Sequence, residues 1–270
     1  MRMVVPVRGE VLQEGSGYVQ VDRRDGVAIV SLNHPEDRNA LSLAMTRALA
    51  EAVHGVEADD TIGAVVLAAT GTVFSAGGSV DDLLEPKALL SETYAGYVAI
   101  LETELPTVAA VSGAALGAGM NLALACDLIV CSPSARFETR FLDVGLHPGG
   151  GHLWQLRERI GPQGAAALAL FGETLEGEEA VRRQLAWRCV PEADLLETAW
   201  KLASRAAGHD RALIERTRRT LAESASVVHA ADAVSLELEP QQWSMGRPEF
   251  LEALGRLRTR LGRAENTSPT

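Results

Sequence analysis

The sequence predicts an α/β fold built on a mainly parallel sheet, followed by a C-terminal region made of helices. Three observations support this prediction. Residues 64–69 and 128–131 are continuous apolar runs of strand length, as is typical of strands covered on both faces. Segments with strand and helix patterns alternate before Asp194, and the apolar spacing after it is helical. In such a sheet, ligands bind beyond the carboxyl ends of the strands.

The first elements follow from local signals. Residues 18–22 and 27–32 flank an Asp25-Gly26 turn, which predicts an antiparallel hairpin. Ser42 can cap a helix because apolar residues follow it at helical spacing, namely Met45, Leu49 and Val53. The segment 81–104 has a helical pattern with a break at Pro86. It is expected to form either the wall of a pocket or an ordinary surface helix.

The later elements are shorter. A buried strand near Val111 is expected to lead through a small-residue turn into an apolar helix that reaches Ala125. Further strands are expected at 128–131, 135–138 and 187–190, and helices at 152–160, 165–170 and 178–185. Beyond Asp194 the helical pattern is expected to be interrupted near Pro240 and Pro248, because proline lacks a backbone N–H.

Two glycine-bearing loops, each behind a predicted strand, are candidate functional features. The first is Phe74-Ser75-Ala76-Gly77-Gly78-Ser79, and the second runs through residues 112–119. At the start of a helix, such a loop presents backbone N–H groups without acceptors and the positive end of the helix dipole. Two such loops can each supply one N–H to an oxygen that becomes negative during a reaction. Either loop alone is equally consistent with an ordinary tight turn.

The composition limits the possible partners and compartments. The net charge of −11 argues against binding to nucleic acids or to membrane surfaces. Cys126, Cys131 and Cys189 lack metal-ligand spacing and are expected to be reduced, buried thiols of a cytoplasmic protein. The N-terminal residues show no pattern of a signal sequence, and the apolar run 122–130 is interrupted by Asp127. No membrane span is therefore expected.

Four motifs resemble those of the crotonase, or enoyl-CoA hydratase/isomerase, superfamily. They are F-S-A-G-G-S-V-D-D-L at 74–83, the run from Pro106 to Asp127, N-H-P-E-D-R-N-A-L-S at 33–42, and V-G-L-H-P-G at 144–149. The likeness extends from Tyr18 into the C-terminal helices. It implies a spiral of ββα units at 17–195 that binds acyl-CoA and a helical oligomerisation region at 196–263, with flexible termini at 1–16 and 264–270. The resemblance also implies a homotrimer or a dimer of trimers.

The resemblance assigns binding roles to particular positions. The backbone N–H groups of Gly78 and Ala118 correspond to the oxyanion hole of the family, which stabilises a thioester enolate. Coenzyme A would belong to the substrate, with no cofactor tightly bound. The positions that correspond to contacts with it are Arg38, Ala40, Ala76, Gly77, Gly78, Ser79 and Val80. Arg256, Arg258 and Arg260 are alternative contacts for its phosphates.

The sequence departs from the family where hydratases carry two glutamates. Those positions correspond to Asn121 and Phe141, and neither an amide nor a phenyl ring can exchange protons in a catalytic cycle. Asn121 can still orient a water or a carbonyl group. The candidates for the missing proton transfer are His147, His152, Asp143 and Glu138, with His147 first because imidazole titrates near neutral pH. Asp143 qualifies only if residues 141–143 are extended, so that its side chain points the same way as Phe141.

Three hypotheses about function remain open from the sequence. The first is an enoyl-CoA hydratase/isomerase-like enzyme, a lyase or isomerase, with a non-standard proton-transferring group. The second is a catalytically silent acyl-CoA-binding protein, which the two substitutions favour. The third is a hydrolase or decarboxylase of CoA thioesters, which needs the same oxyanion hole. No metal site is expected, because His147 and His152 have no third ligand nearby in the sequence.

Overall fold

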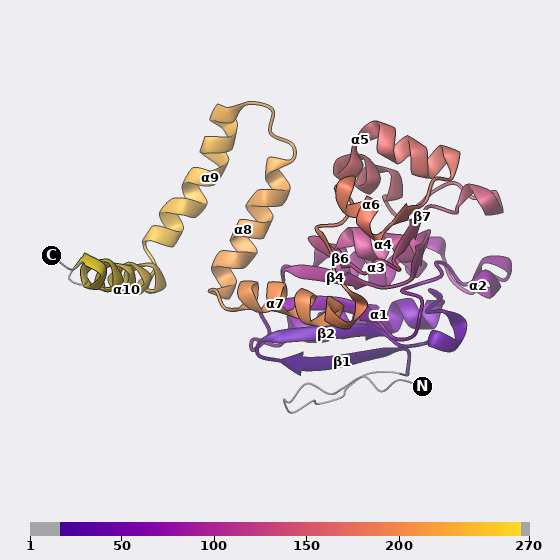
Figure 1. The fold of residues 1–270 in the computed structure, drawn as a ribbon, viewed down its shortest axis with the longest axis horizontal. Helices are drawn as coiled ribbons and strands as arrows, with labels where there is room; N and C mark the ends of the chain where they lie inside the picture. Colours follow the sequence, from indigo (N-terminus) through magenta and orange to yellow (C-terminus); the bar gives the residue numbers. More distant parts are fainter. Residues whose placement is uncertain (1–16, 266–270) are drawn as a thin grey trace. The chain divides into compact units, whose positions relative to one another are not determined.

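The structure, a computed structural model, describes residues 17–265, and the chain divides into two compact units between Gly208 and His209 (Figure 1). The first unit holds the sheet, and it ends later than the predicted boundary at 195 because helix α7 (Leu195–Ala207) packs on the sheet. The second unit contains helices α8 (Arg211–Ser224), α9 (Ala230–Met245) and α10 (Pro248–Glu265). The termini 1–16 and 266–270 lie outside the described residues.

The main sheet has six strands in the order β1-β2-β3-β4-β6-β9. Their bounds are β1 Val19–Arg24, β2 Val27–Leu32, β3 Ala64–Ala69, β4 Thr107–Val111, β6 Leu128–Cys131 and β9 Arg188–Cys189. β1 and β2 are antiparallel, and every other neighbouring pair is parallel. The predicted hairpin is confirmed. Asp25 and Gly26 have φ values of 48° and 76°, as its tight turn requires.

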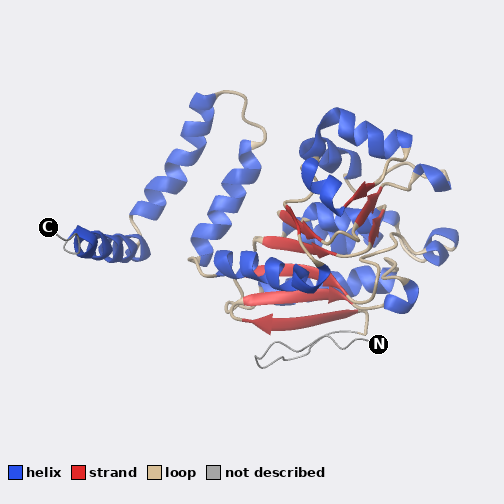
Figure 2. Cartoon of the chain, viewed as in Figure 1, coloured by secondary structure: helices blue, strands red, loops and turns tan. Residues whose placement is uncertain are grey.

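Helices cover both faces of this sheet, and alternate residues of each strand point to opposite faces (Figure 2). On one face, Val65 and Leu67 of β3 pack in the same core as α1 (Leu43–Glu57), α3 (Ala95–Glu102) and α4 (Ala118–Ala125). On the other face, Ala64 and Val66 pack in a core with α7. The expected cap of α1 is confirmed, since the side chain of Ser42 accepts a hydrogen bond from Met45 N at 3.2 Å.

A second, three-stranded sheet in the order β5-β7-β8 was not expected in full. It consists of β5 Ala114–Leu116, β7 Arg136–Glu138 and β8 Leu175–Glu176. The sequence predicted β7, but β5 is only three residues long and its small side chains resemble those of a turn. This short strand carries the chain from β4 to the start of α4.

The remaining helices include one correction. α2 (Val80–Leu84), α5 (His152–Phe171) and α6 (Gly177–Arg182) follow the predicted helical segments, with a break inside α5 at Gly161, where φ is 71°. The predicted interruption at Pro240 is wrong, because α9 runs through this residue. A proline inside a helix removes one backbone hydrogen bond, and here the helix continues despite that loss.

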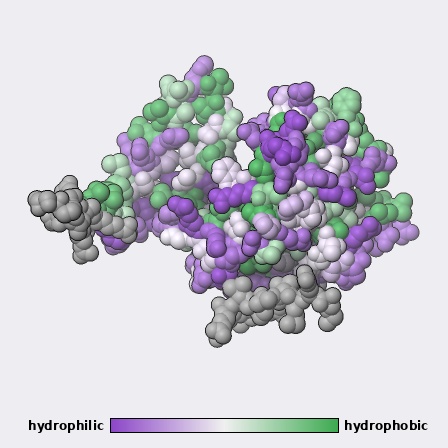
Figure 3. Space-filling view, viewed as in Figure 1, coloured by the Kyte–Doolittle hydropathy of each residue, from purple (hydrophilic) through white to green (hydrophobic). Residues whose placement is uncertain are grey.

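The surface of the first unit is chemically mixed. Hydrophilic and hydrophobic residues are intermixed over the first unit on the face drawn in Figure 3. Among the described helices, none combines the length and the apolar character that a membrane span requires.

Asn39 fixes the loop between β2 and α1. Its side chain is 1% exposed, and its Nδ2 donates to the carbonyl oxygens of Thr70 and Val73, each at 2.9 Å. Its Oδ1 accepts from His34 N at 2.8 Å. Asn39 has a φ of 52°, which asparagine tolerates better than most residues. One side chain thus joins the end of β2 to the segment that leads from β3 into the first glycine loop.

We predict that Asn39→Ala lowers the free energy of unfolding by about 3 kcal/mol, because it leaves buried backbone groups without partners. Urea denaturation followed by circular dichroism measures this loss. The matched control is Asn33→Ala, since Asn33 is more exposed and donates to Gly17 O at 3.2 Å. Equal losses in the two variants would contradict the role given to Asn39.

Candidate active site

The two glycine loops lie side by side. Ser75 forms a parallel bridge with Ala115. Ser75 N donates to Ala114 O at 3.1 Å, and Leu116 N donates to Ser75 O at 3.0 Å. The first loop thereby pairs with β5, the strand that leads into α4. Backbone hydrogen bonds thus join two segments that are about forty residues apart in the sequence.

Glycines make this close approach possible. A Cβ atom on Gly77 would lie 2.7 Å from Leu116 O, and one on Gly119 would lie 2.6 Å from the side chain of Ser75. Gly77 and Gly117 also have positive φ values, of 92° and 50°, which L side chains rarely adopt. Larger residues at these positions would push the loops apart.

Gly78 and Ala118 both line one cavity of about 150 Å³. Ala118 is the first residue of α4, so its N–H has no acceptor within the helix. The bridge between Leu41 and Gly78 uses the N–H groups of Leu41 and Ser79, not that of Gly78. Within residues 17–265, neither amide donates a hydrogen bond to another protein group. Two residues whose N–H groups are unused therefore line the same cavity.

The other end of α4 carries a buried cation. The Arg159 guanidinium donates from Nη2 to Leu124 O at 2.8 Å and also to Cys126 O. Burial lowers the pKa of Arg159 from its ordinary value. A guanidinium at this end satisfies carbonyls left open by the helix and complements its dipole. This interaction holds in place the helix that presents the Ala118 amide.

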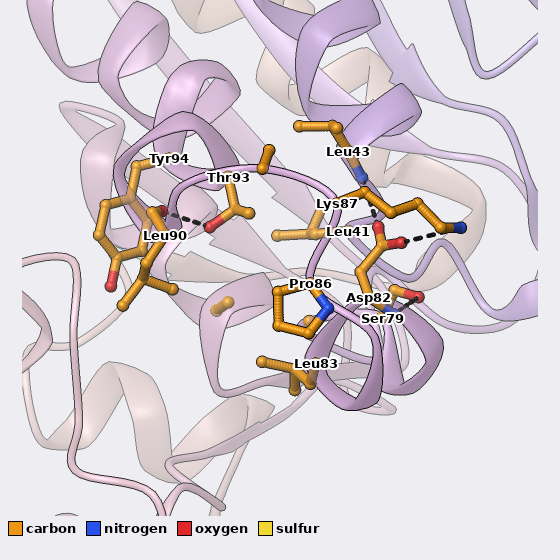
Figure 4. Close-up of a pocket in the computed structure, with 13 residues that line it drawn as sticks. Leu41, Leu43, Ser79, Asp82, Leu83, Pro86, Lys87, Leu90, Thr93 and Tyr94 are labelled. Carbon is orange, nitrogen blue, oxygen red and sulfur yellow. Dashed lines mark hydrogen bonds and ion pairs between the residues drawn. The ribbon is translucent and has the colours of Figure 1, made fainter.

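The cavity wall is mostly apolar and comes from α2 and the segment after it (Figure 4). This location agrees with the predicted pocket wall at 81–104. Three titratable residues line the cavity: Asp82, Lys87 and Tyr94. Asp82 Oδ2 accepts from Leu43 N at 2.7 Å, and Lys87 Nζ lies 3.8 Å from Asp82 Oδ1. In Figure 4, Asp82 and Lys87 lie together, and Tyr94 lies at the opposite end of the cavity.

The residues expected to contact coenzyme A are brought together around the first loop. Ala76 N donates to Arg38 O at 2.9 Å, and Leu41 N, directly after Ala40, donates to Gly77 O at 2.7 Å. Ser79 caps α2, since its hydroxyl accepts from Asp82 N at 3.4 Å. Val80 follows it and is 67% exposed. The predicted positions thus adjoin one another, with Arg38, Gly78 and Val80 exposed and Ala40, Gly77 and Ser79 buried.

Asn121 is committed to a buried hydrogen-bonded chain. Its Nδ2 donates to Gly149 O at 3.0 Å, and its Oδ1 lies 2.6 Å from Nδ1 of His152. Because an amide oxygen can only accept, His152 must carry its proton on Nδ1. Its Nε2 then accepts from the Thr139 hydroxyl, at 3.0 Å. The chain from Asn121 through His152 to Thr139 contains no charged group.

His152 is enclosed by the protein. It is 1% exposed, and burial lowers its pKa from 6.5 to about 4, so it is neutral at physiological pH. The ring of Phe141 packs edge-on against it, with centroids 5.1 Å apart. His152 does not line the cavity.

The other three expected proton-transferring side chains also lie away from the cavity wall. The prediction that residues 141–143 are extended, which would have aligned Asp143 with Phe141, is wrong. Residues Leu142–Val144 form a turn of 3₁₀ helix instead. Asp143 is exposed and pairs with Arg140 at 3.5 Å. Glu138 pairs with Arg136 at 3.0 Å and with Arg140 at 3.3 Å. His147 is exposed, and its Nδ1 lies 2.8 Å from Pro148 O.

The sequence analysis did not identify Tyr94, although its tyrosine neighbour and the glycine run it contacts are visible in the sequence. Tyr94 and Tyr97 stand one helical turn apart, and both reach the glycine run Gly149-Gly150-Gly151. A local pattern does not reveal this, since the two segments are about fifty residues apart. The part of the chain that the structure describes has no cluster of three or more His, Cys, Asp or Glu side chains suited to a metal. All three cysteines are free, Cys126 and Cys131 buried and Cys189 partly exposed.

Comparisons with known proteins agree with this geometry. The family model for enoyl-CoA hydratase/isomerase matches residues 22–255. A probable enoyl-CoA hydratase of Mycobacterium tuberculosis is 39% identical over 240 residues, which cover 84% of this chain and 92% of that protein. A 4-chlorobenzoyl coenzyme A dehalogenase of Arthrobacter is 29% identical, over 90% of this chain and 91% of that one. The solved structure of an enoyl-CoA hydratase from Polaromonas has a TM-score of 0.82 at 26% identity, and the match covers 90% of this chain and 97% of that one.

The depressed pKa of His152 predicts a pH-dependent stability. Because the folded-state value of about 4 lies below the ordinary 6.5, the unfolded chain binds more protons between these pH values. The contribution of neutral His152 to the free energy of unfolding is thus fully present above pH 6.5 and is lost as the pH falls towards 4. Relative to His152→Gln, the wild type should lose about 2 kcal/mol more between pH 7 and pH 5. Denaturant titrations at both pH values measure this difference, with exposed His147→Gln as the control. Equal losses in the wild type and His152→Gln would contradict it.

Proposed function

The chain belongs to the enoyl-CoA hydratase/isomerase family, as its four motifs predicted, and from this premise we propose that it holds a thioester carbonyl between the amides of Gly78 and Ala118. It is an acyl-CoA enzyme of the crotonase superfamily. The proposed step is stabilisation of the enolate that forms when charge moves onto the carbonyl oxygen. The observation that carries this proposal is that two residues with unused N–H groups line one cavity.

The apolar cavity strengthens these two hydrogen bonds. Water competes poorly for donors in a site of low dielectric, so amides fixed in position stabilise a developing charge more than they would in water. The paired loops keep both amides in place before the substrate arrives, because their hydrogen bonds are already formed. The coenzyme A part of the substrate would run along the surface formed by Arg38, Ala40 and residues 76–80.

The proposed reaction does not use two side-chain carboxylates to hydrate an enoyl group. The amide of Asn121 is held by Gly149 O and His152, and Phe141 packs on His152. The carboxylates of Glu138 and Asp143 are paired with arginines. The Arthrobacter relative is named as a dehalogenase, so the names among the relatives are not limited to hydration.

A decarboxylase is the second candidate, and the shortage of free carboxylates favours it. When a 2-carboxyacyl thioester such as malonyl-CoA loses carbon dioxide, the breaking C–C bond leaves its electron pair on Cα, and no side-chain base is required. The remaining requirement is a site that stabilises the enolate, which the two amides would supply. Asp82 lines the cavity, but its carboxylate is occupied by Leu43 N and Lys87.

The first test is turnover of three thioesters in D₂O: crotonyl-CoA, butyryl-CoA and malonyl-CoA. Ultraviolet absorbance follows loss of the conjugated thioester, and mass spectrometry identifies products and deuterium at Cα. Loss of crotonyl-CoA with deuterium uptake supports an enoyl-CoA hydratase or isomerase reaction, and acetyl-CoA from malonyl-CoA supports decarboxylation. Binding of all three without any labelling or product would instead identify a silent acyl-CoA-binding protein.

We predict that Ala118→Pro lowers kcat by about 10²- to 10³-fold, the usual effect of losing one oxyanion-hole donor. Proline is well tolerated at the first position of a helix, so α4 should be retained. The control is Ala118→Gly, which keeps the N–H. Turnover by Ala118→Pro at the rate of the control would show that this amide does not bind the oxyanion.

A further inference from the structure

Tyr94 lies in the wall of the cavity that Gly78 and Ala118 also line. Tyr94 ends the 3₁₀ helix Leu90–Tyr94 and lines the cavity with Gly78 and Ala118. Among the residues that the structure describes, its hydroxyl has no hydrogen-bond partner, and it is not enclosed by protein. A phenol in this position can give a hydrogen bond or a proton to a bound molecule.

The glycine run of residues 149–151 leaves room for this tyrosine. A Cβ atom on Gly149 would lie 2.5 Å from the Tyr94 hydroxyl oxygen, and one on Gly150 would lie 3.6 Å from its ring. The neighbouring Tyr97 lies against Gly151 in the same way, since a Cβ atom on Gly151 would lie 3.2 Å from the Tyr97 hydroxyl oxygen. Only glycine leaves room for Tyr94 at position 149. The unusual run therefore allows the phenol to occupy this position.

The other titratable side chains are less suited to act on a substrate at this end. Asp82 and Lys87 lie at the far end of the cavity and interact with each other (Figure 4). His152 is buried and bonded on both nitrogens. Glu138 and Asp143 are paired with arginines, and His147 is exposed next to Pro148. Tyr94 is the titratable group of the cavity wall whose polar atom is uncommitted within the described residues.

We infer that Tyr94 is the catalytic residue that protonates the enolate at its α-carbon. This inference rests on the proposed function, because the amides of Gly78 and Ala118 must first hold the enolate oxygen. The electron pair of the enolate then forms a Cα–H bond with the phenol proton, the O–H bond of Tyr94 breaks, and the thioester carbonyl re-forms. The Tyr94 phenolate recovers its proton from water.

The test compares the wild type with Tyr94→Phe, Tyr97→Phe and Ala118→Pro. Tyr94→Phe removes only the hydroxyl and keeps the ring against Gly150. Tyr97→Phe is the matched control, since its hydroxyl faces Gln155 Nε2 at 3.3 Å and does not line the cavity. Each protein is mixed with crotonyl-CoA, butyryl-CoA and malonyl-CoA in D₂O, and deuterium at Cα is measured by mass spectrometry. Calorimetric titration with acetyl-CoA gives the affinity, and circular dichroism reports folding.

Tyr94→Phe should lower kcat by about 10²-fold or more, the usual contribution of a positioned proton donor, with affinity for acetyl-CoA unchanged. Tyr97→Phe should keep the wild-type rate. If Tyr94→Phe labels Cα as fast as the wild type while Ala118→Pro does not, the inference fails and the proposed function stands. If Ala118→Pro keeps full activity, or the wild type labels none of the three thioesters, the proposed function fails and the inference with it.

Discussion

The candidate site depends on one constraint, the close approach of two backbone loops. Ser75 pairs with β5, and the glycines at 77 and 119 leave no Cβ atoms where the chains nearly touch. The hydrogen bonds of Ser75 with Ala114 and Leu116 are made before any ligand binds. The amides of Gly78 and Ala118 are therefore positioned by the fold itself, and binding does not have to order them. Asn39 on one side and Arg159 on the other support this arrangement by holding the first loop and the far end of α4.

The electrostatic character of the site follows from what surrounds these loops. Asn121 is hydrogen-bonded to His152 and the ring of Phe141 packs against it, so these three side chains form a neutral group. The nearby charges are neutralised outside the cavity, as Glu138 lies against two arginines. A region without free carboxylates cannot activate water as a base, but it can stabilise an anion through dipoles. Under the proposed function, the amides of Gly78 and Ala118 would therefore be the groups that hold the enolate.

The sequence was informative wherever a feature depends on neighbouring residues. The hairpin at Asp25-Gly26, the cap at Ser42 and the two glycine loops are all local signals, and each is present in the structure. The sequence did not reveal which side chains reach the cavity. The turn of 3₁₀ helix after Phe141 leaves Asp143 exposed, burial lowers the pKa of His152 to about 4, and Tyr94 reaches glycines distant in the chain. These outcomes depend on packing between distant segments, which periodicity does not encode.

The central claim is that two backbone amides polarise the carbonyl group of a bound thioester. Infrared difference spectroscopy tests it directly, with crotonyl-CoA that carries carbon-13 at the thioester carbonyl. Hydrogen bonds from Gly78 and Ala118 would weaken the C=O bond, so the isotope-edited band should move to lower wavenumber when the thioester binds. A band at the same wavenumber in the bound and free thioester, with binding established in the same sample, would contradict the account.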